Sequence, residues 1–142
     1  MENSKKPTVF LGGTVAGSTW RQELISLLEI DYFNPVVDDW LPEHMEEELR
    51  QREICDYLLY VLTPKMQGVY SVAELVDDAH RRPERTVFTF LPEDGDDYFS
   101  PHQLKSMRQT AALVADLGVH CFDDLEAVAE FLNHDWCKPT KP

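Results

Sequence analysis

Acidic residues stand on both sides of an apolar segment in the middle of the 142-residue chain. Glu74 follows the segment YLLYVLT at residues 57–63, and the ten residues before Asp56 include Glu46, Glu47, Glu48 and Glu53. Two carboxylates that share one cleft have their pKa values pushed apart, which yields a nucleophile and an acid. Enzymes use such a pair to cleave glycosyl bonds. Most of the upstream glutamates must form a solvated helix face, and the sequence alone leaves open which of them would be the partner of Glu74.

Glu74 also has a purely structural interpretation. Ser71 is a suitable N-cap residue, and Glu74 follows it at the three-residue spacing of a capping box. A glutamate in the first turn of a helix is also favoured by the helix dipole. On local sequence alone capping is the more common role, so a catalytic role for Glu74 depends on what lies around it.

A glycine-rich turn, GGTVAGS at residues 12–18, offers a second place for a ligand. Glycine lets the backbone approach a bound group, and a helix N-terminus presents free N–H groups to a phosphate or a carboxylate. Arg21, in the first turn of the next helix, could reach such an anion or lie on the surface. The turn lacks the Gly-Lys-Ser/Thr of a P-loop and reads GGxxxG rather than GxGxxG. Asp38 lies about where the ribose-binding acid of a dinucleotide site would be, so that alternative stays open, as does a tight turn without a ligand.

Residues 34–40 (NPVVDDW) are a further group of ligand-binding candidates. Asn34, Asp38 and Trp40 could contact a base or a sugar through hydrogen bonds and stacking. The alternative is that the two aspartates form a turn and the tryptophan belongs to the core. The binding interpretation is favoured by the predicted sheet, in which three strand ends meet here.

Apolar segments alternate with amphipathic ones along the chain. Strands are predicted at residues 7–11, 32–37, 57–63, 86–91 and 119–122. Helices are predicted at 19–28, 43–55, 101–117 and 124–133, with a further helix from Ser71 to the residues before Pro83. This alternation indicates a single α/β domain of the flavodoxin-like (Rossmann-like) type, with three layers and a five-stranded parallel sheet of order 2-1-3-4-5. Ligands bind beyond the carboxyl ends of such strands, where Glu74 and the glycine turn are both expected.

Helix caps, a loop and the domain bounds are also predicted from the sequence. Ser18 and Asp123 are expected to cap the helices that follow them, and residues 92–100 (PEDGDDYFS) are expected to form an acidic loop. The charged helix at 43–55 has a sparse apolar side made of Met45, Leu49 and Ile54. Residues 1–142 are expected to form one domain with a loose tail at 135–142.

Composition restricts the partners and the compartment. The net charge is −13, from 26 acidic and 13 basic residues, so neither a nucleic acid polymer nor an anionic membrane surface is expected as a partner. The 3 cysteines are widely spaced and the histidines lack metal-binding spacings, which predicts free thiols in a reducing compartment and no metal site. The polar N-terminal segment is neither a signal peptide nor a membrane span by composition, and the cytoplasm is the expected location.

The segments FLGGT…WR, NP…DDW and CDYLLYVLTP…GVYSVAEL occur in an order and spacing that resemble the nucleoside 2-deoxyribosyltransferase-like family and the related 2′-deoxynucleoside 5′-phosphate N-hydrolases. The resemblance covers about residues 8 to 90. It implies a flavodoxin-like sheet and cleavage of the N-glycosidic bond of a nucleoside or nucleotide, with no metal and no organic cofactor. It also implies a homodimer or a larger homo-oligomer, in which a neighbouring subunit closes the site.

The same resemblance assigns roles to individual residues. Glu74 takes the place of the nucleophilic glutamate that attacks the anomeric carbon. Glu48, eight residues before Asp56, takes the place of the acid that assists the leaving base or holds the sugar. Together with the motifs described above, it gives the expected substrate-binding residues: Gly12, Gly13, Thr14, Ser18, Arg21, Asn34, Asp38, Trp40, Tyr70 and Ser71.

The chain departs from the family pattern at three positions. Val76 stands where the family usually has a glycine, Gly68 stands where the transferases carry a base-recognising aspartate, and Glu48 replaces the more usual aspartate. The departures at Val76 and Gly68 motivate an alternative of another class, a non-catalytic nucleotide-binding or regulatory module of the same fold. An NAD-cleaving N-ribosyl hydrolase is a further alternative, because it uses the same glutamate chemistry. A receiver-like signalling domain is disfavoured, because the first strand ends in Gly-Gly-Thr rather than in acidic residues.

Overall fold

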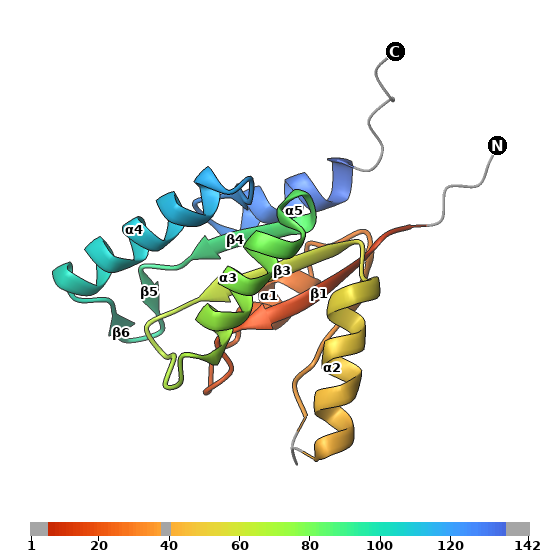
Figure 1. Cartoon of the computed structure of the whole chain (residues 1–142). Helices are drawn as coiled ribbons and strands as arrows, with labels where there is room; N and C mark the ends of the chain where they lie inside the picture. The colour runs from red at the N-terminus through yellow and green to blue at the C-terminus, as the bar shows by residue number, and fades with distance from the viewer. Residues whose placement is uncertain (1–5, 38–40, 136–142) are drawn as a thin grey trace.

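The computed structural model describes residues 6–37 and 41–135 of the chain. Its centre is a five-stranded parallel sheet with the strand order β2-β1-β3-β4-β7 (Figure 1). The strands are β1 (Thr8–Gly13), β2 (Asp31–Phe33), β3 (Tyr57–Leu62), β4 (Thr86–Phe90) and β7 (His120–Cys121). Because β7 is the fifth strand of this sheet along the chain, the predicted order 2-1-3-4-5 is confirmed.

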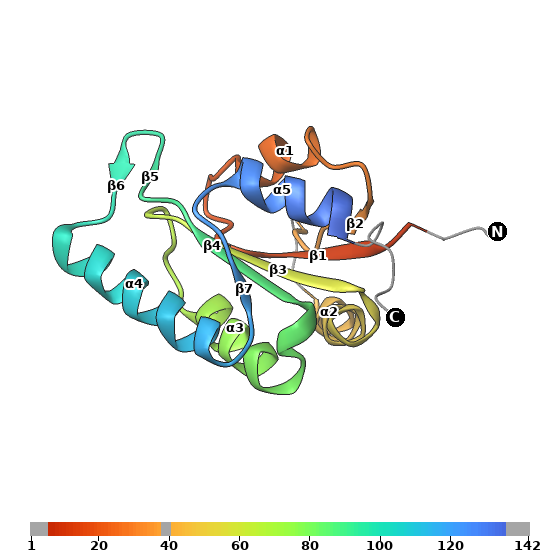
Figure 2. The same ribbon diagram turned by 90° about the horizontal axis from the view of Figure 1, so that it is seen from above.

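Helices cover both faces of the sheet and give the three predicted layers (Figure 2). One face carries α1 (Trp20–Ile25) and α5 (Leu125–His134), and the other carries α2 (Pro42–Ile54), α3 (Tyr70–Arg81) and α4 (Pro101–Asp116). Strand residues alternate between two apolar clusters: Val9 and Leu11 pack with α1 and α5, whereas Phe10 packs with α3 and α4. Every residue of β3 is buried, as expected for a central strand that is covered on both faces.

Several helices begin or end at residues that favour a helix terminus. Ser100 and Gln103 cap α4 through reciprocal hydrogen bonds, and Pro101 occupies the first helical position. Gly118 follows α4 with a φ angle of 110°, which favours glycine. Pro83 stops α3 and opens the short 3₁₀ helix η1 (Pro83–Arg85), because proline has no amide proton to donate to a continuing helix.

Helix α1 is shorter than predicted. The helix begins at Trp20, so the N-cap residue is Thr19 rather than the predicted Ser18, and no side chain caps the helix. Its last residue is Ile25, where the hydroxyl of Ser26 donates a hydrogen bond of 2.7 Å to the carbonyl of Glu23. Such local bonds compete with the helical pattern. The predicted cap at Ser18 and the extension to residue 28 are therefore wrong.

Strand β2 is also shorter than predicted and ends at Phe33 rather than at residue 37. Oδ1 of Asn34 accepts a hydrogen bond of 3.1 Å from the amide of Val36, and Pro35 has no amide proton. Neither residue after Asn34 can therefore donate to the neighbouring strand. β2 lies at the edge of the sheet, which is where the proline predicted it.

Residues 92–100 contain a hairpin that the sequence analysis did not predict. β5 (Glu93–Asp94) pairs antiparallel with β6 (Asp97–Tyr98), around Gly95 with a φ angle of 62°. A two-residue turn with glycine in the first position, here Gly95-Asp96, is a known hairpin signal. The strands are too short to produce an alternating apolar pattern, and the sequence therefore suggested a loop.

Helix α5 begins one residue later than predicted. Oδ1 of Asp124, and not a side-chain oxygen of Asp123, caps the helix by accepting a hydrogen bond of 2.8 Å from the amide of Ala127. Of the predicted loose tail, Asp135 is ordered: it ends α5 and accepts a hydrogen bond of 2.7 Å from the hydroxyl of Tyr57. Residues 136–142 lie outside the described part of the chain. None of the described helices is long and apolar enough to cross a lipid bilayer.

Candidate active site

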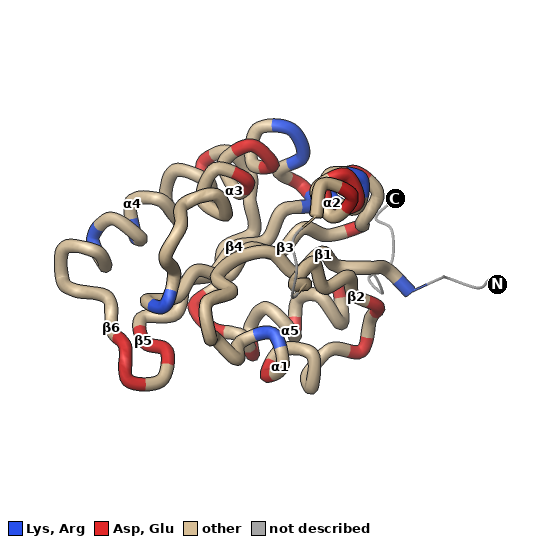
Figure 3. The backbone as a smooth tube through the Cα atoms, turned by 90° about the horizontal axis from the view of Figure 1, so that it is seen from below, with Lys and Arg blue, Asp and Glu red and all other residues tan. Residues whose placement is uncertain are grey.

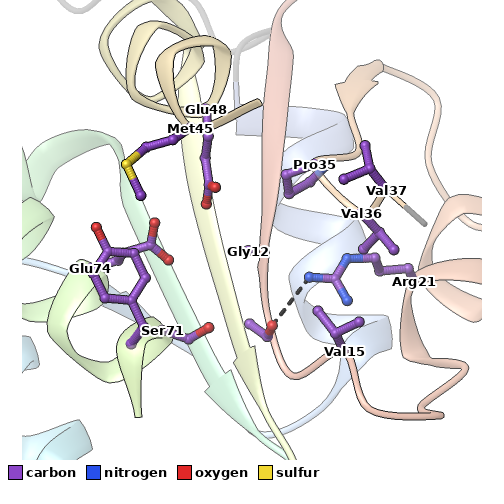
Figure 4. A pocket seen from close by; sticks show the side chains of 12 residues that line it. Gly12, Val15, Arg21, Pro35, Val36, Val37, Met45, Glu48, Ser71 and Glu74 are labelled. Atoms are coloured by element: carbon purple, nitrogen blue, oxygen red, sulfur yellow. Dashed lines mark hydrogen bonds between the residues drawn. The ribbon is translucent and has the colours of Figure 1, made fainter. Parts of the chain in front are cut away.

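A pocket of about 430 Å³ opens at the carboxyl ends of β1 and β3 (Figure 4). These strands are neighbours, and they lead into helices on opposite faces of the sheet, which leaves a crevice between them. The sequence analysis predicted a ligand site at this point. The pocket volume lies in the range that holds small molecules. Its lining residues are Gly12, Gly13, Val15, Arg21, Pro35, Val36, Val37, Met45, Glu48, Tyr70, Ser71 and Glu74.

The floor of the pocket is backbone, because β1 ends in two glycines. Gly13 has a φ angle of 122°, and a Cβ atom there would lie 2.1 Å from the carbonyl oxygen of Val61 in β3. A Cβ atom at Gly12 would lie 2.7 Å from the ring of Tyr60. The glycines therefore let β1 approach β3 closely and leave the space above them open to a ligand.

Arg21 holds the glycine turn from the side of α1. Its Nε donates to the carbonyl of Leu11 (3.1 Å), Nη1 to that of Thr14 (2.7 Å) and Nη2 to that of Gly13 (3.3 Å). The guanidinium also lies 4.4 Å from the ring centre of Trp20. Burial lowers the pKa of Arg21 to about 10, so the side chain stays charged at neutral pH. The alternative of a solvated surface arginine is wrong, because Arg21 is buried and lines the pocket.

Glu74 is not a helix cap. α3 begins at Tyr70 after Val69, so Ser71 is the second helical residue and no side chain caps the helix. Glu74 therefore lies in the second turn, beyond the amides that a capping box satisfies. Its side chain is only 6% exposed and lines the pocket (Figure 4). The capping interpretation is wrong, and the carboxyl group is available for another role.

Glu48 of α2 and Glu74 of α3 both line the pocket, and their carboxyl groups point toward one another (Figure 4). Among the four upstream glutamates, Glu48 is the one that lines this pocket, whereas Glu47 pairs with Arg50 at 2.9 Å. The contact answers the question that the sequence alone left open. Two carboxyl groups this close repel each other when both are ionised, which favours the protonated form of Glu74.

The surroundings of Glu74 favour its protonated form. Burial raises the pKa of Glu74 from its ordinary 4.5 to about 8, and the hydrogen bond and charge of Glu48 and the charge of Asp78 act in the same direction. The charge of Arg52, whose Nη1 lies 3.8 Å from Oε2 of Glu74, acts in the opposite direction. With a pKa of about 8, Glu74 keeps its proton at neutral pH. A perturbed carboxyl pair in a pocket is typical of an active site and can supply a nucleophile and an acid together.

Acidic side chains also dominate the elements around this pair. Figure 3 shows Asp and Glu along α2, α3 and the β5–β6 hairpin, with basic residues interspersed on α2 and at the end of α3. The chain as a whole carries a net charge of −13. The field near the pocket is therefore negative, which adds to the retention of a proton on the pair.

A family model described as nucleoside 2-deoxyribosyltransferase like matches residues 6–93, which is well over half of the chain. The chain belongs to this family. Membership indicates nucleoside deoxyribosyltransferase-like activity in general and points to a small-molecule nucleoside as the partner. The matched region contains every residue that lines the pocket. No curated protein matches the chain.

The other residues expected of a nucleoside 2-deoxyribosyltransferase-like protein lie in several places. Tyr70 and Ser71, at the start of α3, line the pocket beside Glu74. Thr14 is buried below them, where its Oγ1 accepts a hydrogen bond of 2.9 Å from the amide of Thr63. Thr14 lines an adjoining cavity of about 360 Å³, which shares Tyr70 and Ser71 with the main pocket. The second cavity gives a bound molecule room to extend past the glycine turn.

Four expected residues lie away from the main pocket or outside the described residues. Ser18 is not among the lining residues, and its Oγ accepts a hydrogen bond of 3.4 Å from the amide of Trp20. Asn34 lines a smaller neighbouring cavity of about 180 Å³, which it shares with Glu48. Asp38 and Trp40 lie outside the described residues, so their contact with a ligand stays a prediction.

The apolar wall of the pocket could not be identified from the sequence pattern. It consists of Val15, Pro35, Val36, Val37 and Met45. The pattern places 35–37 in a strand, whereas these residues leave the sheet edge and turn toward the pocket. The available signal was Pro35, which ends the pairing of β2 and leaves the two valines after it without a place in the sheet.

No three His, Cys, Asp or Glu side chains in residues 6–37 and 41–135 are grouped so that they could hold a metal ion. Two carboxyl groups line the pocket, those of Glu48 and Glu74. The expectation of a reaction without metal or organic cofactor stays a prediction.

Proposed function

We propose that this protein cleaves the N-glycosidic bond of a (deoxy)nucleoside or nucleotide, or transfers its sugar to another base, through a covalent intermediate on Glu74. The observation that carries the proposal is the Glu48–Glu74 pair, two carboxyl groups that face each other inside a pocket of suitable volume, with the pKa of Glu74 raised to about 8. Membership of the nucleoside 2-deoxyribosyltransferase-like family supports the same class of substrate.

The pair divides the reaction into two displacements. First, an ionised oxygen of Glu74 attacks C1′ of the sugar, and a C–O bond forms as the C–N bond to the base breaks. The electron pair of the broken bond passes to the base nitrogen, which takes the proton of Glu48. Next, water or a second base attacks C1′ and displaces Glu74, while Glu48 accepts the proton of the attacking molecule. The intermediate ester thus replaces one difficult step by two easier ones, with retention at C1′.

The shared proton lets two similar residues take different roles. Glu74 is ionised whenever the proton resides on Glu48, and Arg52 at 3.8 Å favours that arrangement. Activity needs the singly protonated pair, so base release should fall as the pH rises through about 8, where the pKa of Glu74 lies. The expected kcat profile is bell-shaped with its alkaline limb near this value. A rate that stays constant across that limb contradicts the assignment of the acid.

The walls of the pocket suit the two halves of a nucleoside. Val36 and Met45 offer an apolar surface to the base, and Gly12 and Gly13 leave room for the sugar beside the carboxyl pair. Pockets for small ligands commonly combine a mostly apolar lining with a few polar groups that fix orientation. Here the polar groups are gathered at the position where C1′ must lie.

The test is release of free base from a panel of deoxynucleosides, ribonucleosides, their 5′-monophosphates and NAD. The wild type releases base from at least one of them, and Glu74→Gln abolishes release. Glu48→Gln lowers kcat by about 10²–10⁴-fold, the usual contribution of a general acid. Glu53→Gln, an exposed glutamate on the same helix, is the matched control and leaves the rate unchanged. No release by the wild type, or undiminished release by Glu74→Gln, defeats the proposal.

A second base in the assay distinguishes transfer from hydrolysis. A transferase yields a new nucleoside, whereas a hydrolase yields free sugar in the presence of the added base. Mass spectrometry of a rapidly quenched reaction detects the ester as one sugar residue added to the peptide that contains Glu74. Addition of the sugar to any other residue contradicts the assigned nucleophile.

A non-catalytic nucleotide-binding module is the second candidate. Gly68 favours it, because this residue lines the adjoining cavity and a Cβ atom there would meet nothing within 4 Å. The base-recognising side chain implied by the family resemblance is thus replaced by glycine where there is room for a side chain. A nucleotide that raises the melting temperature of the wild type without loss of its base selects this candidate.

The proposal includes a homodimer or a larger homo-oligomer. Met45 and Leu49, one helical turn apart on the sparse apolar side of α2, are exposed. A second copy of the chain that packs on α2 would cover them and close the pocket beside Met45. Light scattering of the purified protein tests this, and a monomer at every concentration contradicts it.

A further inference from the structure

Helix α2 is held in place by a charged side chain. Arg52, with 4% exposure, is the one buried residue among those of α2, all of which the structure describes. The apolar residues Met45, Leu49 and Ile54, which form the sparse apolar side of this charged helix, are exposed. Hydrophobic burial therefore contributes little to the position of this helix. Yet α2 carries Glu48, whose placement against α3 must be accurate for the proposed chemistry.

Arg52 makes its contacts on α3. Its Nε lies 3.1 Å from Oδ2 of Asp78, and its Nη2 lies 3.0 Å from Oδ1 of Asp78 and 2.8 Å from Oδ2 of Asp77. Its Nη1 is left to face Oε2 of Glu74 at 3.8 Å. Asp78 has 0% exposure, so the two-pronged contact is fully removed from water. Charge-assisted bidentate contacts of this kind are strong and fix orientation.

The spacing of these residues links the contact to the carboxyl pair. Glu48 and Arg52 are four residues apart on α2, and Glu74 and Asp78 are four residues apart on α3. Residues at this spacing lie on the same face of a helix, one turn apart. The ion pair of Arg52 with Asp78 therefore sets the register in which Glu48 meets Glu74 one turn away.

We propose that Arg52 is a positioning residue for the carboxyl pair: it docks α2 on α3 so that Glu48 meets Glu74, and it supplies the positive charge that Glu74 faces. The inference rests on the proposed function, because it assigns Arg52 a role in the chemistry of that site. Asp78 is its counterpart, since it holds the guanidinium and withdraws part of its charge from Glu74. Lysine cannot replace Arg52 fully, because a single ammonium group cannot make the two-pronged contact.

The charged groups around Glu74 balance one another. Glu48 and Arg52 face it from α2, Asp78 lies on its own helix, and Tyr60 of β3 donates its hydroxyl proton to Asp78. On α1, Arg21 interacts with the charge of Glu48. Arg52 lowers the pKa of Glu74, whereas Glu48 and Asp78 raise it. Arg52 is the cation that acts on Glu74, and it only partly offsets burial and the charges of Glu48 and Asp78.

Arg82 provides a matched control. Its Nε donates to the same carboxylate of Asp78 at 2.9 Å, and its side chain is 14% exposed, but its guanidinium has no contact with Glu74 among the ion pairs of the described residues. Arg82→Gln thus removes a cation from the same network without removing one from the carboxyl pair. A purely structural role of the network predicts that Arg82→Gln and Arg52→Gln differ only in stability.

The test compares pH profiles of kcat for base release and ¹³C NMR titrations of the Glu74 carboxyl carbon. The NMR signal of this carbon is assigned because it is missing from the spectrum of Glu74→Gln. Arg52→Gln should move both limbs of the profile and the NMR titration upward by about 1–3 pH units, the usual effect of a removed neighbouring cation. Asp78→Asn should move them downward, and Arg82→Gln should leave them in place while it lowers the melting temperature. Arg52→Lys should keep the limbs near those of the wild type but lower kcat at least tenfold.

The outcomes separate this inference from the proposed function. If the wild type releases no base, the proposed function falls, and the NMR titration still decides the role of Arg52. If the midpoint of the Glu74 titration is the same in Arg52→Gln as in the wild type, the inference is overturned. The same holds if Arg82→Gln shifts this midpoint as much as Arg52→Gln does. If Arg52→Gln does not fold, Asp78→Asn decides: a downward shift supports the inference, and an unchanged or upward titration overturns it.

Discussion

Replacement of Glu74 by glutamine should stabilise the folded protein at alkaline pH and have little effect in acid. In the unfolded chain Glu74 loses its proton near the ordinary pKa of 4.5, whereas the folded chain retains the proton up to about 8. Below pH 4.5 the carboxyl group is protonated in both states. Between the two values the unfolded state ionises and the folded state does not, so unfolding becomes progressively more favourable. The stability contributed by the protonated carboxyl group is thus fully present in acid and is lost by about pH 8.

The size of the effect follows from the interval between the two pKa values. At about 1.4 kcal/mol per unit, the interval from 4.5 to about 8 corresponds to roughly 4 to 5 kcal/mol. Glutamine is neutral at every pH, and its amide can donate an N–H to Glu48 as the protonated carboxyl group donates its O–H. We therefore expect Glu74→Gln to exceed the wild type by roughly 3 to 5 kcal/mol near pH 9, and by less than about 1 kcal/mol near pH 5.

Urea denaturation at several pH values measures these differences directly. Wild type, Glu74→Gln and the exposed control Glu53→Gln are compared under identical conditions. The control should differ from wild type by no more than about 0.5 kcal/mol at each pH, as surface substitutions usually do. If the gap between Glu74→Gln and wild type is the same in acid and in alkali, the carboxyl group ionises alike in the folded and unfolded chains. That result would refute the buried, proton-sharing pair on which the proposed mechanism depends.

Other substitutions test the local geometry. Gly13→Ala should destabilise the protein by more than about 3 kcal/mol in urea denaturation, because its Cβ would lie 2.1 Å from the carbonyl oxygen of Val61. Gly17 has a φ angle of 78° but no neighbour within 4 Å of such a Cβ, so Gly17→Ala should cost only about 1 kcal/mol. Asp124→Ala should remove about 1 kcal/mol of stability in a thermal melt through loss of the α5 cap, and equal loss in Asp123→Ala would contradict the assigned cap. Met45→Ala should raise KM for the released nucleoside with little change in kcat, because an apolar wall contacts substrate and transition state alike.

The sheet and the place of the pocket were predictable because their signals are local. The unbroken apolar run at Tyr57–Leu62 suits only a strand that is covered on both faces, and the structure buries all of it. The glycines at the end of β1 mark a close approach of two backbones. A Cβ atom at Gly13 would lie 2.1 Å from the carbonyl oxygen of Val61, so a side chain does not fit there. The position of the crevice then follows from strand order alone, without knowledge of any side chain.

The role of Glu74 was not predictable from spacing. Ser71 and Glu74 have the separation of a capping box, but the helix already begins at Tyr70, so the serine caps nothing. Helix starts are uncertain by one or two residues in any sequence-based prediction, and here that difference turns a cap into a pocket residue. The same holds at α5, where adjacent aspartates at 123 and 124 compete for one cap position and the sequence does not rank them.

The docking of α2 was beyond sequence patterning for a different reason. Met45 and Leu49 belong to the sparse apolar side of α2, yet the structure exposes both and buries Arg52 against a partner 26 residues away. A pattern of apolar residues cannot reveal a helix that is held by an ion pair, because the partner lies on another element. Buried ion pairs add little net stability compared with apolar packing, so stability alone does not explain why this helix is docked by charge. The proposed positioning role explains Arg52 better: its contact with α3 brings the carboxyl group of Glu48 against that of Glu74 in a fixed register. The conflict between apolar pattern and burial in α2 is therefore itself evidence for a site at this helix, since such conflicts concentrate where function opposes stability.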